Sequence, residues 1–174
     1  MDFNRTSRVY RLILSKFQYW SPIPLRLIVG CGFLAHGYAK IEKGPDHFFG
    51  ILHALGVPAP QLMGWTTIAI ELAGGAAVLA GAFVVGASVP MAAVLLVAMF
   101  TVHLPYGFSS IKLLAVTASG AQFGPPGYEV DLLYLACLAA LGLGGAGPFS
   151  IDGLLAKSRD VQSSRTNRQR LGND

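Results

Sequence analysis

Charged residues are almost confined to the two ends of this 174-residue chain: the first 20 residues hold five and the last 26 hold eight. The central residues 21–148 hold nine: Arg26, Lys40, Glu42, Lys43, Asp46, Glu71, Lys112, Glu129 and Asp131. Charged residues make up 13% of the chain, against about 25% in a typical soluble domain. Mean hydropathy is +0.53, which excludes a disordered chain. The sequence predicts an integral membrane protein with two polar ends.

Four apolar segments approach the roughly 20 residues that a membrane-spanning helix needs. They cover residues 22–41, 61–83, 86–104 and 128–147, with prolines at most of the boundaries. The sequence therefore predicts an all-α fold, a four-helix bundle in the membrane, with Val84 and Val85 as a tight turn between the second and third helices. Residues 105–127 are broken by Pro, Gly and Ser. They leave room for a short interfacial or re-entrant helix around residues 110–119 but not for a fifth span.

Lysine and arginine residues predict the orientation of the bundle. Nine of them lie in the two ends: Arg5, Arg8, Arg11, Lys16, Lys157, Arg159, Arg165, Arg168 and Arg170. The positive-inside rule then places both termini in the cytoplasm. We expect a basic N-terminal segment (1–21), a membrane domain (22–155) and a basic tail (156–174) whose last dozen residues have a disordered composition. Basic tails beside a membrane favour anionic lipid over nucleic acid as the partner.

Ionisable side chains inside the predicted spans are the candidate functional residues, because a charge there costs about 2.5–3.5 kcal/mol on insertion scales. Four of them are expected between the middle of the bilayer and its outer rim: His36, Lys40, Glu71 and His103. Arg26 lies near the cytoplasmic side, and Glu129 and Asp131 lie at the outer mouth of the fourth span. At about 100° per residue, Arg26, His36 and Lys40 share one half of the first helix, which we expect to face the bundle interior.

Two interpretations of these residues stay open. In the functional one, a polar pocket opens to the outer face. Its proposed catalytic residues are Glu71, His103 and His36, and its proposed ligand-binding residues are Lys40, Arg26 and Glu129. In the structural one, Glu71 forms an ion pair with Arg26 or Lys40 that only fixes helix packing.

Metal and haem sites are weaker alternatives. His36, Glu71 and His103 would form a two-histidine, one-carboxylate metal set, and two histidines could ligate a haem. Cys31 and Cys137 form no CxxC motif and are expected to be structural. His47 and His53 are expected in solvent. Two groups of small residues, Gly74–Gly75 in the second span and Gly142, Gly144 and Gly145 in the fourth, are expected to pack helices together.

Several short motifs, taken in order, resemble the DoxX family of small bacterial membrane proteins. They run from Arg26-Leu-Ile-Val-Gly30 and His36-Gly-Tyr-Ala-Lys40 through Leu55-Gly-Val-Pro-x-Pro60 and Glu71-Leu-Ala-Gly-Gly75 to Leu79-x-Gly81. They continue with His103-x-Pro-x-Gly107-Phe108, Gly127-Tyr-Glu129 and Gly147-Pro-Phe-Ser-Ile-Asp152. The resemblance covers about residues 22–155. It implies a four-helix protein of the bacterial inner membrane, in a family that includes proteins similar to a subunit of a thiosulfate:quinone oxidoreductase.

Three functions follow as hypotheses. The first is a quinone-interacting subunit of a redox complex, in which His36, Lys40 and His103 donate hydrogen bonds to the quinone and Glu71 relays protons. No cofactor motif is visible, so the electron source would lie on a protein partner. The second is a non-catalytic scaffold or binding module, as a homo-oligomer or with a partner. The third is a transporter, which the absence of an internal repeat disfavours.

Overall fold

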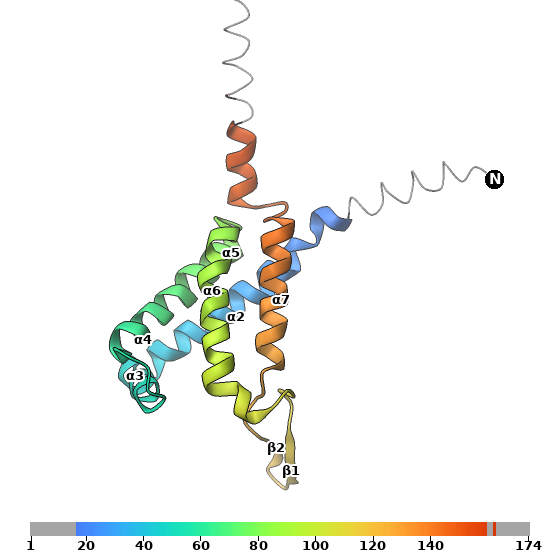
Figure 1. Cartoon of the computed structure of the whole chain (residues 1–174). Helices are drawn as coiled ribbons and strands as arrows, with labels where there is room; N and C mark the ends of the chain where they lie inside the picture. The colour runs from blue at the N-terminus through green and yellow to red at the C-terminus, as the bar shows by residue number, and fades with distance from the viewer. Residues whose placement is uncertain (1–16, 160–161, 163–174) are drawn as a thin grey trace, which may run out of the picture.

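The computed structural model describes residues 17–159 and residue 162, and these residues are mostly helical. Two helical rods, α6 and α7, run side by side, and α2 crosses them obliquely, as does the rod formed by α4 and α5 (Figure 1). A β-hairpin and helix α3 lie at one end of this bundle, and a helix over residues 151–159 projects from the other (Figure 1). Of the predicted end segments 1–21 and 156–174, residues 1–16, 160–161 and 163–174 lie outside the described residues.

Helix α2 spans Pro22–Glu42 and matches the predicted first span. Pro22 is its first residue, a position where the missing N–H has no partner to lose. It leads into the short helix α3, Pro45–Ala54, which occupies the segment expected to be a loop. Phe49 of α3 is buried and its ring lies 5.8 Å from that of Trp65, so α3 is packed on the bundle.

The second predicted span is one continuous helical rod of α4 (Pro60–Ala69), the π-turn η1 (Ile70–Gly74) and α5 (Gly75–Ala80). It ends three residues earlier than expected, and the turn to the next helix is residues 81–83, so the predicted turn at Val84–Val85 was wrong. The reason is Gly81, whose φ of +66° ends the helix in the left-handed conformation. The N–H groups of Gly81 and Ala82 bond to the carbonyls of Val78 and Ala77, the pattern of a Schellman cap.

The third predicted span is longer than expected. It comprises α6 (Val84–Ala98), the π-turn η2 (Met99–His103) and the 3₁₀ turn η3 (Leu104–Tyr106). Pro90 lies inside α6 and the helix continues through it. Pro105 was expected to stop the helix, but it is accommodated in the 3₁₀ turn.

The segment after η3 contains a β-hairpin, so the short helix for which residues 110–119 left room is not formed. Strands β1 (Leu113–Thr117) and β2 (Gly120–Phe123) pair antiparallel, with Thr117 opposite Gly120. Val116 and Thr117 are β-branched and favour a strand, and Gly120 has a φ of +117° that closes the turn. The fold is therefore helical with one two-stranded sheet, rather than helical throughout.

Helix α7 spans Glu129–Gly144 and is shorter than the predicted fourth span. The chain then turns through Gly145 and Gly147, both at positive φ, before the helix over residues 151–159. Ser150 begins that helix as its N-cap: its Oγ accepts a hydrogen bond from the Gly153 N–H at 3.1 Å, which satisfies one of the free donors of the first turn.

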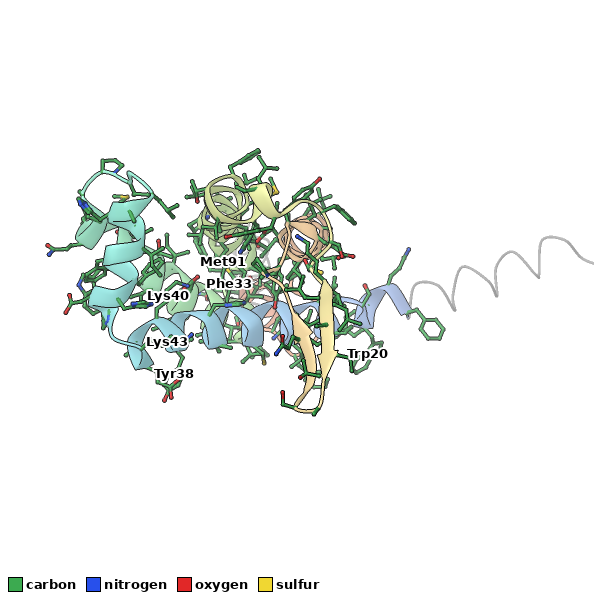
Figure 2. All side chains as sticks on the ribbon, turned by 90° about the horizontal axis from the view of Figure 1, so that it is seen from below. Trp20, Phe33, Tyr38, Lys40, Lys43 and Met91 are labelled. Atoms are coloured by element: carbon green, nitrogen blue, oxygen red, sulfur yellow. The ribbon has the colours of Figure 1, made fainter. Side chains whose placement is uncertain are left out.

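The core lies where α2, α5, α6 and α7 meet, and it includes Val29, Phe33, Val78, Met91 and Leu141. Figure 2 shows Phe33 and Met91 between α2 and the α6–α7 pair, whereas Tyr38 points away from the bundle. The packing expected at Gly74 and Gly75 is confirmed. A Cβ on Gly74 would lie 2.8 Å from Met91 Sδ, and one on Gly75 would lie 3.0 Å from the Gly30 carbonyl.

The packing expected at Gly142, Gly144 and Gly145 was wrong, because a Cβ at these positions would meet no atom within 4 Å. These glycines lie at the end of α7 and just after it, between the core residues Leu141 and Ala146, and their own Cβ positions face open space.

The outer surface of the bundle is strongly apolar. Large exposed side chains such as Ile28, Leu62, Val89, Phe100 and Leu133 cover all four long helices. Two helices of the described part, Pro60–Ala80 and Val84–Tyr106, are long and apolar enough to cross a membrane. Helix α2 has the length but carries Arg26 and Lys40, and α7 has 16 residues, about 24 Å.

Candidate functional site

Lys40 and Glu71 form a buried ion pair between α2 and η1. The Lys40 ammonium lies 2.8 and 2.7 Å from the two Glu71 carboxylate oxygens, and the side chains are 20% and 7% exposed. The ammonium also lies 5.0 Å from the Phe48 ring. Figure 2 shows Lys40 on the side of α2 that faces α3 and α4. Of the two partners considered for Glu71, the structure selects Lys40.

Close helix packing makes this pair possible. Gly37 lies one turn before Lys40, and a Cβ on it would be 3.1 Å from Glu71 Cβ and 2.9 Å from the Leu72 side chain. The missing side chain at Gly37 therefore lets α2 approach η1 closely enough for the lysine to reach the carboxylate. Glu71 lies in a π-turn, a rare helix distortion that occurs frequently at functional sites.

A hydrogen bond joins His103 and Asp131 at the hairpin end of the bundle. His103 Nδ1 lies 2.6 Å from an Asp131 carboxylate oxygen, and the side chains are 27% and 6% exposed. When Asp131 is ionised, its oxygens only accept, so Nδ1 carries the hydrogen and Nε2 is left for another partner. His103 is the last residue of the second π-turn, η2.

The two pairs lie at different depths in the bundle. Gly74 contacts Met91, which aligns the two antiparallel rods. Counting from that contact at 1.5 Å per residue, Glu71 lies about 5 Å and His103 about 18 Å toward the hairpin end. No hydrogen bond or ion pair connects the two pairs within residues 17–159. The four residues expected in one pocket are thus divided between two separate pairs, and His36 belongs to neither.

His36 is exposed on α2, and its ring has no hydrogen-bond partner among residues 17–159. The expectation that its half of α2 faces the interior holds for Arg26 and Lys40 but not for His36. His47 and His53 are exposed, as expected. The described residues contain no group of three or more His, Cys, Asp or Glu side chains that could hold a metal.

Arg26 lies at the opposite end of the bundle from His103 and is 6% exposed. Its guanidinium donates to five backbone carbonyls, two at the end of α5 and three in the turn after α7, at 2.7–3.2 Å: those of Val78, Leu79, Ala146, Pro148 and Phe149. Carbonyls at a helix C-terminus carry the negative end of the helix dipole. The geometry makes Arg26 a clamp between two chain segments rather than a ligand-binding group.

Asp152 completes this clamp. Its carboxylate accepts hydrogen bonds from the free N–H groups of Phe83 and Val84 at 2.7 and 3.1 Å, and its own N–H donates to the Gly81 carbonyl at 3.0 Å. Asp152 therefore caps the start of α6 from 68 residues away in sequence, a role usually filled by a local residue.

Glu129 holds the chain that leads out of η3. Its carboxylate accepts the Ser110 N–H at 3.0 Å, and the Ser110 hydroxyl in turn lies 3.2 Å from the Val130 N–H at the start of α7. This reciprocal arrangement resembles a capping box. It ties residue 110 to the start of α7, next to Asp131.

Asp131 is a functional candidate that the sequence analysis did not include among the catalytic or ligand-binding residues. The sequence placed it only at the outer mouth of the fourth span. A carboxylate in the first turn of a helix has an ordinary explanation in the helix dipole. Its pairing with His103 depends on how α6 and α7 meet, and no sequence spacing encodes that contact.

The comparison with protein families bears on the segment that holds Arg26, Lys40, Glu71 and His103. Residues 21–104 match the DoxX family model. The DoxX resemblance is thereby confirmed for this segment, from the start of α2 to the start of η3, and DoxX is a family of membrane proteins. The motifs after residue 104, with Asp131 and Asp152, lie outside the match. No curated protein and no solved structure matches the chain.

Proposed function

We propose that this protein is a quinone-interacting subunit of a redox complex in the bacterial inner membrane, crossing it four times with both termini in the cytoplasm. The observation that carries the proposal is the His103–Asp131 pair, with its buried carboxylate and partly exposed imidazole. The strongly apolar exterior and the DoxX match support the membrane part of the proposal.

The pair suits the chemistry of a quinone. Reduction of a quinone to a quinol consumes two electrons and two protons. His103 donates one hydrogen bond to Asp131 through Nδ1, and Asp131 thereby orients the ring. When Nε2 also carries a proton, it would donate to a quinone carbonyl and transfer that proton. The second proton of the quinol would follow after Nε2 is reprotonated from water at the partly exposed ring. The electrons would come from a protein partner that carries its own cofactor.

In this proposal Glu71 and Lys40 have a different role from His103. Both Glu71 oxygens already contact the Lys40 ammonium, so the pair is self-contained and holds α2 against η1. Glu129 positions the chain beside Asp131 through Ser110, and Arg26 is a clamp at the far end.

A scaffold without catalytic residues is the second candidate, favoured by a separate observation. Among the described residues, every buried side-chain nitrogen or oxygen has a hydrogen-bond partner. Polar groups that are satisfied within one chain can serve only to fix helix packing. In that case His103–Asp131 would be a third structural link beside Lys40–Glu71 and Arg26.

Quinone binding by purified protein in detergent separates the two candidates, with a short-chain ubiquinone as the probe. We expect saturable binding by the wild type, a loss of at least tenfold in affinity in His103→Ala and Asp131→Asn, and little change in Lys40→Gln. The melting temperature of each variant is measured in parallel, so that loss of binding is separated from loss of folding. Absence of binding in the wild type, or equal binding by His103→Ala, would favour the scaffold.

A further inference from the structure

The helix over residues 151–159 is a surface that the proposed function does not use. It is exposed along nearly its whole length, and Leu154 and Leu155 are 68% and 53% exposed. Lys157 and Arg159 follow on the same helix, and neither has a hydrogen bond or ion pair within residues 17–159. A short helix is marginal in water by itself, so a surface that covers its leucines would stabilise it.

The clamp fixes where this helix begins. Arg26 holds the carbonyls of Ala146, Pro148 and Phe149, and Asp152 is bonded to the start of α6. The first turn of the helix therefore lies at the level where α6 begins, and Figure 1 shows the rest projecting away from the bundle. This level is one end of the apolar rod Val84–Tyr106, which places it at a membrane boundary.

Aromatic side chains mark the same level. The rings of Trp20 and Phe149 lie 5.7 Å apart, and those of Tyr19 and Trp20 lie 5.8 Å apart. All three side chains are exposed. Tyrosine and tryptophan are enriched at the boundary between lipid and water, so this cluster is placed at the headgroups.

Distances along the helix match the thickness of a headgroup layer. At 1.5 Å per residue, Leu154 and Leu155 lie about 3–5 Å beyond Asp152, and Lys157 and Arg159 lie about 8–10 Å beyond it. The headgroup layer of one leaflet is about 5–8 Å thick. The leucines thus fall within that layer, and the backbone of the two cations falls at its outer edge, from which their long side chains can reach back to the phosphates.

The charge of the helix also suits binding to anionic lipids. Within residues 151–159 the acidic residue is Asp152, whose carboxylate is occupied by two backbone N–H groups at the start of α6. The described part that projects, residues 153–159, therefore carries two cations and no acid, and Asp160 follows it in the sequence outside the described residues. A basic helix adjoining a membrane span attracts anionic lipids by about 1 kcal/mol per lysine or arginine.

We propose that residues 151–159 form a binding site for anionic phospholipid headgroups, with Lys157 and Arg159 on the lipid phosphates and Leu154 and Leu155 against the lipids at the base of the headgroup layer. The site is continuous with the lipid-facing surface of the bundle. It does not depend on quinone binding, because it lies at the opposite end from His103.

The test uses the full-length protein reconstituted in phosphatidylcholine bilayers. Electron spin resonance of spin-labelled phosphatidylglycerol and of spin-labelled phosphatidylcholine gives the preference of the protein surface for the anionic lipid. We expect a preference in the wild type that falls several-fold in Lys157→Gln/Arg159→Gln and is retained in Lys157→Arg/Arg159→Lys. Because surface charges are screened at short range in high salt, 1 M NaCl should lower the wild-type preference toward that of the glutamine variant.

Lys43→Gln is the matched control for Lys157→Gln, since Lys43 is also exposed but lies at the other end of α2 beside Glu42 and Asp46. It should leave the preference almost unchanged. Equal preference in the wild type and in Lys157→Gln/Arg159→Gln would overturn the proposal. A wild-type protein that does not distinguish the two lipids would also overturn it. In that case a protein partner or a second copy of the chain would cover Leu154 and Leu155 instead.

Discussion

Replacing Arg26 tests the claim that this residue is a structural clamp and not part of a ligand site. The substitution Arg26→Ala removes all five hydrogen bonds to backbone carbonyls at once. In the described structure, no other side chain forms hydrogen bonds both to the end of α5 and to the turn after α7.

The expected cost follows from which carbonyls lose their only partner. The Val78 carbonyl also accepts the Gly81 N–H, and the hydrogen bonds to the Leu79 and Phe149 carbonyls are only part-buried. Two buried carbonyls are then left without a donor: those of Ala146 and Pro148. At about 1–3 kcal/mol for each unsatisfied buried group, the loss is at least about 2 kcal/mol. Arg26→Lys retains the charge but has three donors in place of five, so it should lose about half as much.

The assay is reversible unfolding of the purified protein in mixed micelles with increasing dodecyl sulfate, followed by tryptophan fluorescence. Lys43→Ala is the control, because Lys43 is an exposed cation at the C-cap of the same helix with no side-chain hydrogen bond in the described structure. If Arg26→Ala is no less stable than Lys43→Ala, the guanidinium contributes nothing to folding and the reasoning fails. If Arg26→Lys is as unstable as Arg26→Ala, a positive charge alone does not stabilise the carbonyls, and the five donors of the guanidinium are needed.

Three further predictions use the same unfolding assay. Asp152→Ala removes the cap of α6 and should cost about 1–2 kcal/mol, and an unchanged stability would show that water replaces the cap. Gly81→Ala should lower the free energy of unfolding by more than 1 kcal/mol, because φ is +66° and the new Cβ would lie 2.7 Å from the guanidinium carbon of Arg26. The control is Gly142→Ala, whose new Cβ would have no atom within 4 Å and should leave the stability unchanged. Equal effects of the two substitutions would contradict the packing argument. Lys40→Met leaves Glu71 buried without its cation, so this variant should have a lower free energy of unfolding than Lys40→Met/Glu71→Leu. If the double variant is the less stable of the two, water must solvate the isolated carboxylate.

Much of the helical arrangement was accessible from the sequence because it depends on local patterns. Apolar runs of about 20 residues set the positions of α2, the α4–α5 rod and the α6 rod to within a few residues. The errors occurred where the outcome depends on one backbone conformation. Gly81 ends α5 three residues early, and an apolar, interrupted segment that suited a short helix forms the hairpin of β1 and β2 instead.

The candidate site was predicted less completely, since it depends on contacts between helices. The sequence identified the costly charges, and all of the buried ones have partners in the structure. It named Lys40 as one of two partners for Glu71, but it grouped His36 and His103 with them by membrane depth. Depth does not specify which helix face meets which, so His103 pairs with Asp131 of α7, and His36 faces outward.

The clamp at Arg26 also bears on where the structural unit ends. The family match stops at residue 104, yet two residues within it, Arg26 and Gly81, make their contacts with residues 146–152. The carbonyls of that turn satisfy a buried cation, and Asp152 supplies the cap that α6 lacks locally. A chain cut after residue 104 would leave Arg26 with two carbonyls in place of five and would leave the α6 N–H groups of Phe83 and Val84 without their cap. The turn after α7 is therefore as much a part of the folded unit as the matched helices, and the basic helix that follows it is held at a fixed position by the same contacts.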